Sequence, residues 1–240
     1  MDSILSPHLF RSAPLSSHLR YELKLASDTI SPAQARSLIR LHPEGFRVAF
    51  PSREVNNLYL DTVDLQSFNA NLAGLSVRRK LRLRWYGIPE RSVVSNPILE
   101  LKIKENMLGN KKRQPLEVTL DLTRGYAQIL QTIRAHAGEK WRSRLLTFTQ
   151  PALINRYRRD YFVTPDEAIR ATIDYNLVAF DQRMGSRPNL DRPLPLPATV
   201  VIEVKSAPEY HERLQRVMGY FPIARSRSSK YVNGVMGGPF

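Results

Sequence analysis

The sequence predicts an α+β fold: an eight-stranded antiparallel β-barrel with a polar, charged bore and helices packed outside. Polar and apolar residues alternate with a period of two in about eight segments, which is typical of strands with one buried face. Almost every one of these strands carries Arg or Lys at its polar positions. Three further segments have helical periodicity and an apolar face that needs covering. About eight antiparallel strands can close into a barrel whose bore holds side chains or a small ligand.

The expected strands follow one another along most of the chain. The most regular lies at 77–86, where Arg82 and Arg84 alternate with Leu81 and Leu83. Successive side chains of a strand point to opposite faces, so the basic residues share one face. The expected strands are residues 19–25, 55–61, 77–86, 98–104, 111–120, 151–163, 169–178 and 200–205.

Three helices are expected between these strands. Ser31 followed by Pro32 is typical of an N-cap and the first helical position. Gly138 is expected to end the second helix. The expected helices are residues 32–42, 121–137 and 208–219.

The charged strand faces are expected to line the bore. For a single strand, a charged face turned to water is the commoner arrangement. Helices with apolar faces, however, pack best on the apolar faces of the strands, which leaves the charged faces inside. Bases then outnumber acids in the bore by roughly three to one, and an unpaired buried charge costs several kcal/mol. Water or a bound anion removes that cost, and a phosphate chain, with a divalent metal on the carboxylates, fits best.

The composition is that of a globular protein with a basic excess: 240 residues, 42% hydrophobic, with a net charge of +14. We expect an N-terminal extension at 1–18 and a single domain at 19–240, with the proline-rich segment 187–197 as a surface loop. The lack of cysteine excludes disulfides, thiol nucleophiles and Cys-based metal sites. No segment has the apolar length of a membrane span or the form of a signal peptide, so we expect a soluble, cytoplasmic protein.

Eight short motifs carry a resemblance to a known family. In chain order they are RYELK at 20–24, NLYLDT at 57–62, KLRLRWY at 80–86, LELK at 99–102, YRRDYF at 157–162, RATID at 170–174, VIEVK at 201–205 and SKY at 229–231. In this order and spacing they resemble the polyphosphate polymerase domain of the vacuolar transporter chaperone (VTC) family, a branch of the triphosphate tunnel metalloenzymes. The resemblance covers about Arg20 to Gly234.

The resemblance implies an eight-stranded antiparallel tunnel that binds triphosphate or polyphosphate. It makes Glu203 a metal-binding glutamate and Tyr157 a tunnel tyrosine. Lys24 and one lysine of the pair at 111–112, assigned to Lys112, match further phosphate-binding positions. It also implies phosphate contacts by Arg82, Arg84, Lys102, Arg159, Arg170 and Lys230. Of these, all but Lys230 are expected to be catalytic, together with Glu203.

Strand parity adds residues to this candidate site. Lys80 and Lys205 lie on the polar faces of their strands, so we expect them to bind phosphate as well. Glu22 and Glu100 occupy equivalent polar positions and are expected to help Glu203 hold a divalent metal, Mn²⁺ or Mg²⁺.

The expected function is metal-dependent transfer of the terminal phosphoryl group of a nucleoside triphosphate to a polyphosphate chain. Such transfer needs in-line positioning and charge neutralisation rather than a protein nucleophile. Water as the acceptor would give a triphosphatase, although Arg20 stands where the related adenylate cyclase and thiamine triphosphatase branch has an additional acid. A non-catalytic polyphosphate-binding module would need the bases but not Glu203. Binding of RNA is disfavoured because the bases share strand faces with carboxylates, so nucleic acid is not an expected partner.

Overall fold

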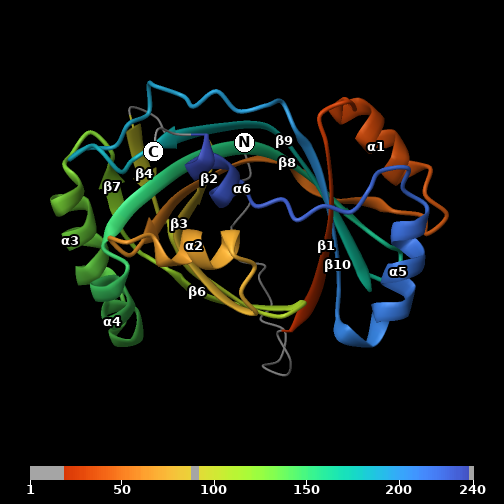
Figure 1. Cartoon of the computed structure of the whole chain (residues 1–240), viewed down its shortest axis with the longest axis horizontal. Helices are drawn as coiled ribbons and strands as arrows, with labels where there is room; N and C mark the ends of the chain where they lie inside the picture. Colours follow the sequence, from red (N-terminus) through yellow and green to blue (C-terminus); the bar gives the residue numbers. More distant parts are fainter. Residues whose placement is uncertain (1–18, 88–91, 238–240) are drawn as a thin grey trace, which may run out of the picture.

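Eight strands form a closed ring around a central bore (Figure 1). The computed structural model describes residues 19–87 and 92–237. The strand order around the ring is β1-β10-β9-β8-β2-β3-β5-β6, with antiparallel neighbours throughout. The ring closes where two residue pairs join β1 to β6. The expected α+β barrel is therefore confirmed, whereas the expected extension at 1–18 lies outside the described residues.

All eight expected strands are present, although some bounds differ. The ring strands are β1 (Arg20–Ser27), β2 (Arg47–Asp61), β3 (Val77–Tyr86), β5 (Ile98–Glu105), β6 (Leu108–Pro115), β8 (Gln150–Val163), β9 (Ile169–Asp181) and β10 (Val200–Ser206). β2 begins eight residues before the expected strand at 55–61. The segment expected as one strand at 111–120 contains the end of β6 and most of β7 (Thr119–Asp121), which forms a separate two-stranded sheet with β4 (Val93–Ser95).

The three expected helices are also present, and three short ones were not predicted. α1 (Pro32–Arg40) begins at a capping box in which Ser31 and Gln34 bind each other's backbone amides. The other expected helices are α3 (Tyr126–His136) and α5 (His211–Gly219), the latter following a 3₁₀ turn at Pro208–Tyr210. The unpredicted helices are α2 (Gln66–Leu72), α4 (Glu139–Thr147) and α6 (Lys230–Met236).

Two apolar clusters cover the outer surface of the ring. On one side, Leu81, Leu83 and Trp85 of β3 are buried in a cluster with Ile129 and Ile133 of α3. On the other side, apolar residues of β1, β9 and β10 pack with α1 and α5. Figure 1 shows the two helical groups at opposite sides of the ring. Because the apolar positions face outward, the alternate polar positions face the bore.

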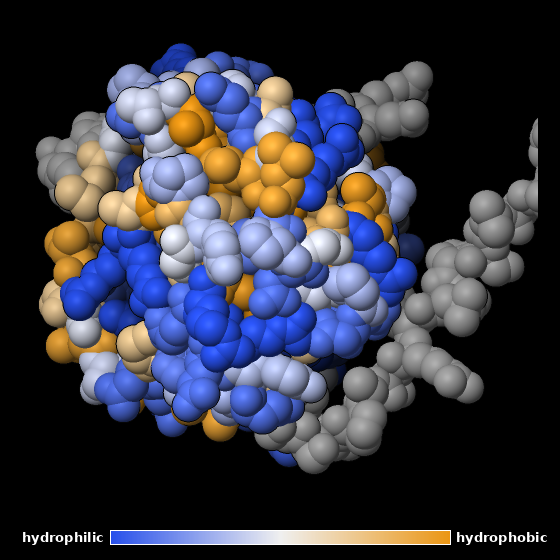
Figure 2. Space-filling view, turned by 90° about the vertical axis from the view of Figure 1, so that its right-hand side faces the viewer, coloured by the Kyte–Doolittle hydropathy of each residue, from blue (hydrophilic) through white to orange (hydrophobic). Residues whose placement is uncertain are grey.

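The surface over α1 and α5 carries charged side chains interspersed with exposed apolar ones (Figure 2). The exposed apolar side chains include Leu41 and Val48. No helix in the described part of the chain has the length and apolar character needed to cross a bilayer.

One end of the bore is filled by α6 rather than by a strand connection. Its Tyr231 stacks on Tyr59 of β2, with 4.8 Å between ring centroids, and its hydroxyl donates to Asp61 at 2.5 Å. Asp61 also accepts from the backbone amides of Ser67 and Phe68 in α2, so one carboxylate joins β2, α2 and α6. The helix approaches β8 so closely that a Cβ on Gly234 would collide with the Leu153 side chain.

Candidate functional site

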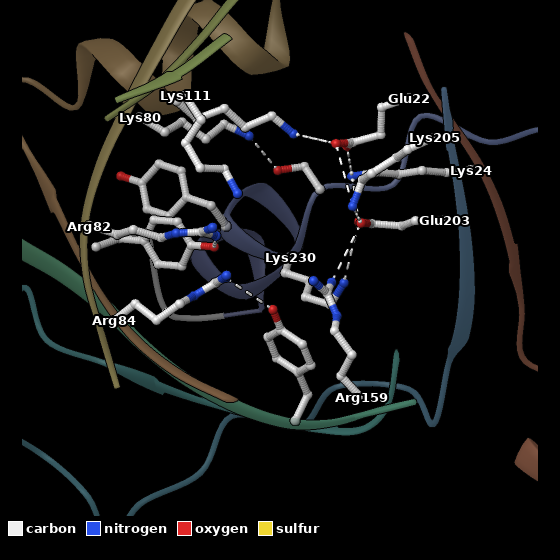
Figure 3. A pocket seen from close by; sticks show the side chains of 15 residues that line it. Glu22, Lys24, Lys80, Arg82, Arg84, Lys111, Arg159, Glu203, Lys205 and Lys230 are labelled. Atoms are coloured by element: carbon white, nitrogen blue, oxygen red, sulfur yellow. Dashed lines mark hydrogen bonds and ion pairs between the residues drawn. The ribbon is translucent and has the colours of Figure 1, made fainter. Parts of the chain in front are cut away.

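The bore holds a pocket to which seven of the eight ring strands and the α6 segment contribute (Figure 3). β9 reaches it only through Asp174, which contacts lining residues. Figure 3 shows the side chains converging on a central space with α6 behind. The lining residues are Glu22, Lys24, Tyr59, Lys80, Arg82, Arg84, Lys102, Lys111, Tyr157, Arg159, Glu203, Lys205, Ser229, Lys230 and Tyr231. Strand alternation therefore produces the polar interior that the sequence predicted.

Positive charge dominates this lining. Nine of the lining side chains are Lys or Arg, and two are carboxylates, Glu22 and Glu203. Glu100 and Asp174 contact the cations from the wall. Among the described residues that line the pocket, bases outnumber acids by nine to two. Even with Glu100 and Asp174 added to the acids, cations remain for an anionic ligand to neutralise.

The part of the pocket formed by β1 and β10 balances its charges internally. We call Glu22, Lys24, Glu203 and Lys205 the paired wall. Lys24 Nζ lies 3.4 Å from Glu22 and 3.3 Å from Glu203. Lys205 Nζ lies 2.7 Å from Glu203 and 3.8 Å from Glu22. Lys102 of β5 reaches across to both oxygens of Glu22 at 2.9 Å.

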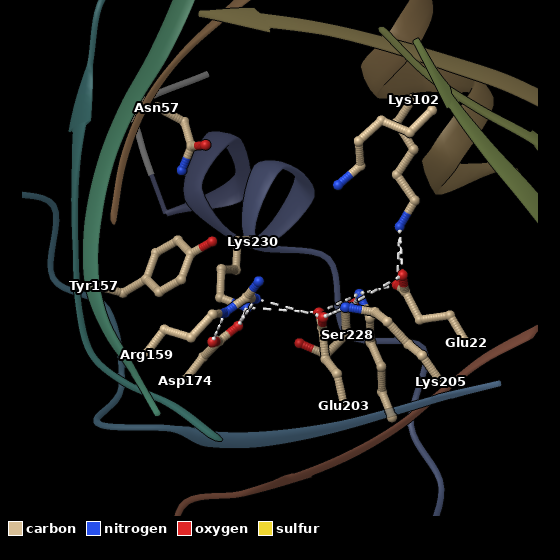
Figure 4. Close-up of polar contacts among 12 residues, drawn as sticks. Glu22, Asn57, Lys102, Tyr157, Arg159, Asp174, Glu203, Lys205, Ser228 and Lys230 are labelled. Atoms are coloured by element: carbon tan, nitrogen blue, oxygen red, sulfur yellow. Dashed lines mark hydrogen bonds and ion pairs between the residues drawn. The ribbon is translucent and has the colours of Figure 1, made fainter. Parts of the chain in front are cut away.

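A second group of ion pairs surrounds Asp174 (Figure 4). The Asp174 carboxylate accepts from Arg159 of β8 and from Lys230 of α6, each at 2.5 Å. Both cations also approach Glu203, at 3.4 and 3.9 Å. Asp174 is 1% exposed and therefore acts from behind the cations, fixing their direction toward the bore.

The part of the pocket formed by β3 and β6 has a different character. We call Lys80, Arg82, Arg84 and Lys111 the cationic wall. Among the described residues, its ion pairs are all made with one carboxylate, Glu100, which contacts Arg82 directly and lies 3.6 Å from Arg84 and 3.9 Å from Lys111. Arg84 is oriented instead by neutral groups: its Nε donates to Asn57 at 2.9 Å.

Two lysines of the cationic wall have strongly lowered pKa values. Burial, together with repulsion from Lys24 and Lys102, lowers the pKa of Lys80 well below its ordinary value. Its Nζ donates to the hydroxyl of Ser229 at 2.8 Å. Burial also lowers the pKa of Lys111, because attraction by Glu100 does not offset it. An anion in the bore would raise both pKa values by favouring the charged ammonium groups.

The acids of the pocket, unlike these two lysines, are stabilised in their charged form. Burial alone would raise the pKa of Glu203, but Lys205, Lys24 and further cations outweigh it and lower the pKa well below its ordinary value. The same balance lowers the pKa of Glu22, where Lys102 is the main cation. Both carboxylates are therefore ionised at neutral pH, as a metal ligand must be.

The paired wall has the donor chemistry for a divalent metal. Glu22 and Glu203 both contact the ammonium groups of Lys24 and Lys205, so the two carboxylates converge on a common position for a cation. Carboxylate oxygens suit Mg²⁺, which usually takes one or two of them and completes its shell with water and phosphate oxygens. The described residues contain no cluster of three or more acids and histidines. The residues therefore fit a metal that arrives with phosphate better than one held by protein ligands alone.

Three predicted site residues lie elsewhere than expected. Lys112 is exposed, and its neighbour Lys111 faces the pocket, because a shift of one residue in a strand reverses the side chain. Arg170 is exposed, since it is the second residue of β9 and lies at the rim. Glu100 is 1% exposed and held by Arg82 and Arg113 on the opposite wall, so it does not join Glu22 and Glu203.

The remaining predicted residues converge in the pocket: Glu22, Lys24, Lys80, Arg82, Arg84, Lys102, Tyr157, Arg159, Glu203, Lys205 and Lys230. Lys111 is the lysine of the pair at 111–112 that reaches the pocket. Four other residues at the pocket were not predicted: Tyr59, Asp174, Ser229 and Tyr231. Each of the four lies within one of the eight motifs, so the motifs carried a signal for them.

The fold and the lining together define a class of protein: a closed antiparallel β-tunnel whose basic interior suits a phosphate chain. Within that class, the chain belongs to the VTC domain family, whose model matches residues 20–236. This match confirms the resemblance inferred from the eight motifs.

Two solved structures are similar to the chain at low sequence identity, and the first of them shares its fold. The PH1819 protein from Pyrococcus horikoshii OT3 is 13% identical, with a TM-score of 0.50 over 90% of this chain and 98% of that chain. A putative adenylate cyclase from Vibrio parahaemolyticus is 12% identical, with a TM-score of 0.49 over 87% of this chain and 94% of that chain. No curated protein matches the chain.

Proposed function

We propose that this protein is a metal-dependent phosphotransferase that moves the terminal phosphoryl group of a nucleoside triphosphate to a polyphosphate chain inside the bore. The observation that carries the proposal is the division of the pocket into a cationic wall and a paired wall. The first offers charges to a polyanion, and the second offers two carboxylates to a metal. Membership of the VTC domain family supports the same substrate class.

The residues would act by positioning and charge neutralisation. Arg82 and Arg84 present planar guanidinium groups that can each hold two phosphate oxygens. Lys80 and Lys111 act as point charges on the oxygens of the transferred group, where charge spreads in the transition state. Arg159, held from behind by Asp174, is fixed in direction before substrate binds, so little reorganisation is needed. Glu22 and Glu203 would hold a divalent metal, which would supply Lewis acidity to the site.

The direct test is to incubate purified protein with ATP and Mn²⁺, separate any polymer by electrophoresis and assay free phosphate. Polymer formation would support the proposal. Free phosphate without polymer would indicate a triphosphatase with the same set of residues. The absence of both products, together with tight tripolyphosphate binding, would indicate a binding module.

Neighbouring lysines of β6 provide a matched control. Lys111 lines the pocket, whereas its neighbour Lys112, a residue of the same type on the same strand, is exposed. Lys111→Ala should weaken tripolyphosphate binding by about tenfold, the loss of one charged contact, while Lys112→Ala should leave it unchanged. Equal effects of the two substitutions would contradict a phosphate site inside the bore.

A further inference from the structure

An aromatic cluster lies at the end of the bore away from α6, which we call the mouth. Tyr86 follows Arg84 by two residues on β3, and Tyr161 follows Arg159 by two residues on β8, so both continue the inward-facing rows. Phe50 of β2 pairs with Tyr161 in the sheet, and their rings meet edge to face at 5.9 Å. The inward rows thus change from basic to aromatic where the strands leave the pocket.

Arg53 of β2 lies among these rings. Its guanidinium carbon is 5.7 Å from the Phe50 centroid, 5.8 Å from the Tyr86 centroid and 6.0 Å from the Tyr161 centroid. No carboxylate of the described residues lies within 4.0 Å of Arg53. The rings therefore supply its main contacts, through cation–π attraction.

Two of the rings are open to solvent. Phe50 is 53% exposed and Tyr86 is 42% exposed. An apolar side chain stabilises the fold by burying its surface away from water. Large aromatic side chains at exposed positions therefore add little to the stability of the barrel. β2 is also irregular here, with register shifts on both sides of Phe50. The exposed faces are available to a planar ligand.

The position of the cluster matches the length of a nucleotide. Two residues along a strand span about 7 Å, so the rings lie about that far beyond the arginines of the pocket. α6 lies at the opposite end of the bore (Figure 3). There its Tyr231 stacks on Tyr59 of β2. A triphosphate bound to Arg84 and Arg159 would therefore extend its nucleoside toward the mouth.

We propose that Phe50, Arg53, Tyr86 and Tyr161 form a subsite for the base of the nucleoside triphosphate donor, an inference that rests on the proposed function. Aromatic rings and a guanidinium plane both stack on the face of a base. Stacking is tolerant of base identity because every base has a π-face. The subsite should thus accept several bases and favour the larger purines.

The experiment compares ATP, UTP and tripolyphosphate by titration calorimetry in metal-free buffer, where turnover is absent. The test variant is Phe50→Ala combined with Tyr86→Ala, which removes two exposed rings without changing charge. Tyr220→Ala removes an aromatic side chain that is 62% exposed on another surface and serves as the matched control.

The double variant should bind ATP about tenfold more weakly, the size expected when stacking on aromatic side chains is lost, and UTP should lose less. Tripolyphosphate should bind within twofold of wild type. An unchanged affinity for ATP, or equal losses for ATP and tripolyphosphate, would overturn the subsite. Wild-type protein that fails to bind tripolyphosphate would instead overturn the phosphate tunnel, and the subsite with it.

Discussion

The two walls of the pocket are equally buried but differ in electrostatics. On the paired wall, Glu203 and Glu22 outweigh burial and raise the pKa of Lys24 above its ordinary value. On the cationic wall, burial lowers the pKa of Lys80, whose Nζ has a hydroxyl partner and, in the described part of the chain, no carboxylate within 4.0 Å. The same residue type in the same bore is thus stabilised as a cation on one side and destabilised on the other.

For the proposed function, this difference separates two tasks. The paired wall balances its charges without a ligand, because its lysines pair with Glu22 and Glu203. The cationic wall is incomplete without substrate, because its charges repel one another. Binding of a metal and binding of a phosphate chain can therefore be tested with different substitutions, from the largest expected effect to the smallest.

The largest effect is expected from Glu203→Gln, which removes a charge from the paired wall and keeps the shape. If Glu203 holds the metal, turnover should fall at least 100-fold, which corresponds to about 2.7 kcal/mol of transition-state stabilisation. Tripolyphosphate binding without metal should persist or tighten, because a negative charge has left the bore. The measurement is turnover across a Mn²⁺ titration, with binding followed in parallel.

The alternative is that Glu203 serves only as an ion-pair partner of Lys205 and Lys24. In that case Glu203→Gln would change the melting temperature but leave the Mn²⁺ response equal to that of wild type. Glu117→Gln, at an exposed position outside the bore, controls for the loss of one acid.

A second substitution, Arg84→Lys, tests the geometry of the cationic wall at constant charge. The Arg84 guanidinium is 3% exposed and fixed by Asn57 and by the Tyr157 hydroxyl. Lysine cannot reproduce its planar contacts, so tripolyphosphate affinity should fall by about 10- to 100-fold, the range for charged hydrogen bonds. Calorimetry gives the affinity, and a thermal melt checks that the variant folds. An unchanged affinity would show that only charge matters at this position.

Lys80→Met should sharpen the comparison by separating stability from binding. Replacing a repelled, buried ammonium with an apolar side chain should stabilise the free protein by about 1 kcal/mol, or a few degrees in melting temperature. The same change should weaken tripolyphosphate binding by about tenfold. Lys24→Met on the paired wall should instead lower the melting temperature, because it removes a cation that contacts both Glu203 and Glu22. A destabilised Lys80→Met protein would contradict the assignment of the two walls.

The smallest effect concerns pH. Because the pKa values of Lys80 and Lys111 are lowered in the free site and an anion raises them, tripolyphosphate binding should take up protons. Affinity should therefore fall as pH rises between the lowered values and the ordinary lysine value of 10.5. Calorimetry in buffers of different ionisation enthalpy measures the uptake, which should shrink in Lys80→Met. Affinity that rises with pH would contradict this prediction.

Most of the barrel could be predicted because each strand shows its own alternation. The parity of Arg82 and Arg84 on β3 is unambiguous, and both reach the pocket. Parity cannot assign adjacent residues of the same type, such as Lys111 and Lys112, to the two faces of a strand when the alternation is weak, as it is in β6. An error of one position then places each of the two side chains on the wrong face. Parity also does not show how far along the bore a side chain lies, which is why Arg170 was placed inside rather than at the rim.

The parts that were missed depend on tertiary contacts. α6 is seven residues long and is held by Asp61 and by the close approach of Gly234 to β8 rather than by its own periodicity. Such short helices are marginal without packing. Asp174 lay on the expected face of β9, but its role became clear only when Arg159 and Lys230 were seen to share it.

The closure of the ring has a consequence for folding kinetics. β1 pairs with β10, and Lys24 donates to the Ser228 carbonyl across 204 residues of sequence. Contacts between residues so far apart in sequence form slowly. The chain loses the entropy of closing the loop before these contacts contribute any favourable free energy. An anion that bridges the two walls finds its partners only in the closed ring. Tripolyphosphate should therefore lengthen the lifetime of the native state against unfolding while leaving the rate of refolding almost unchanged.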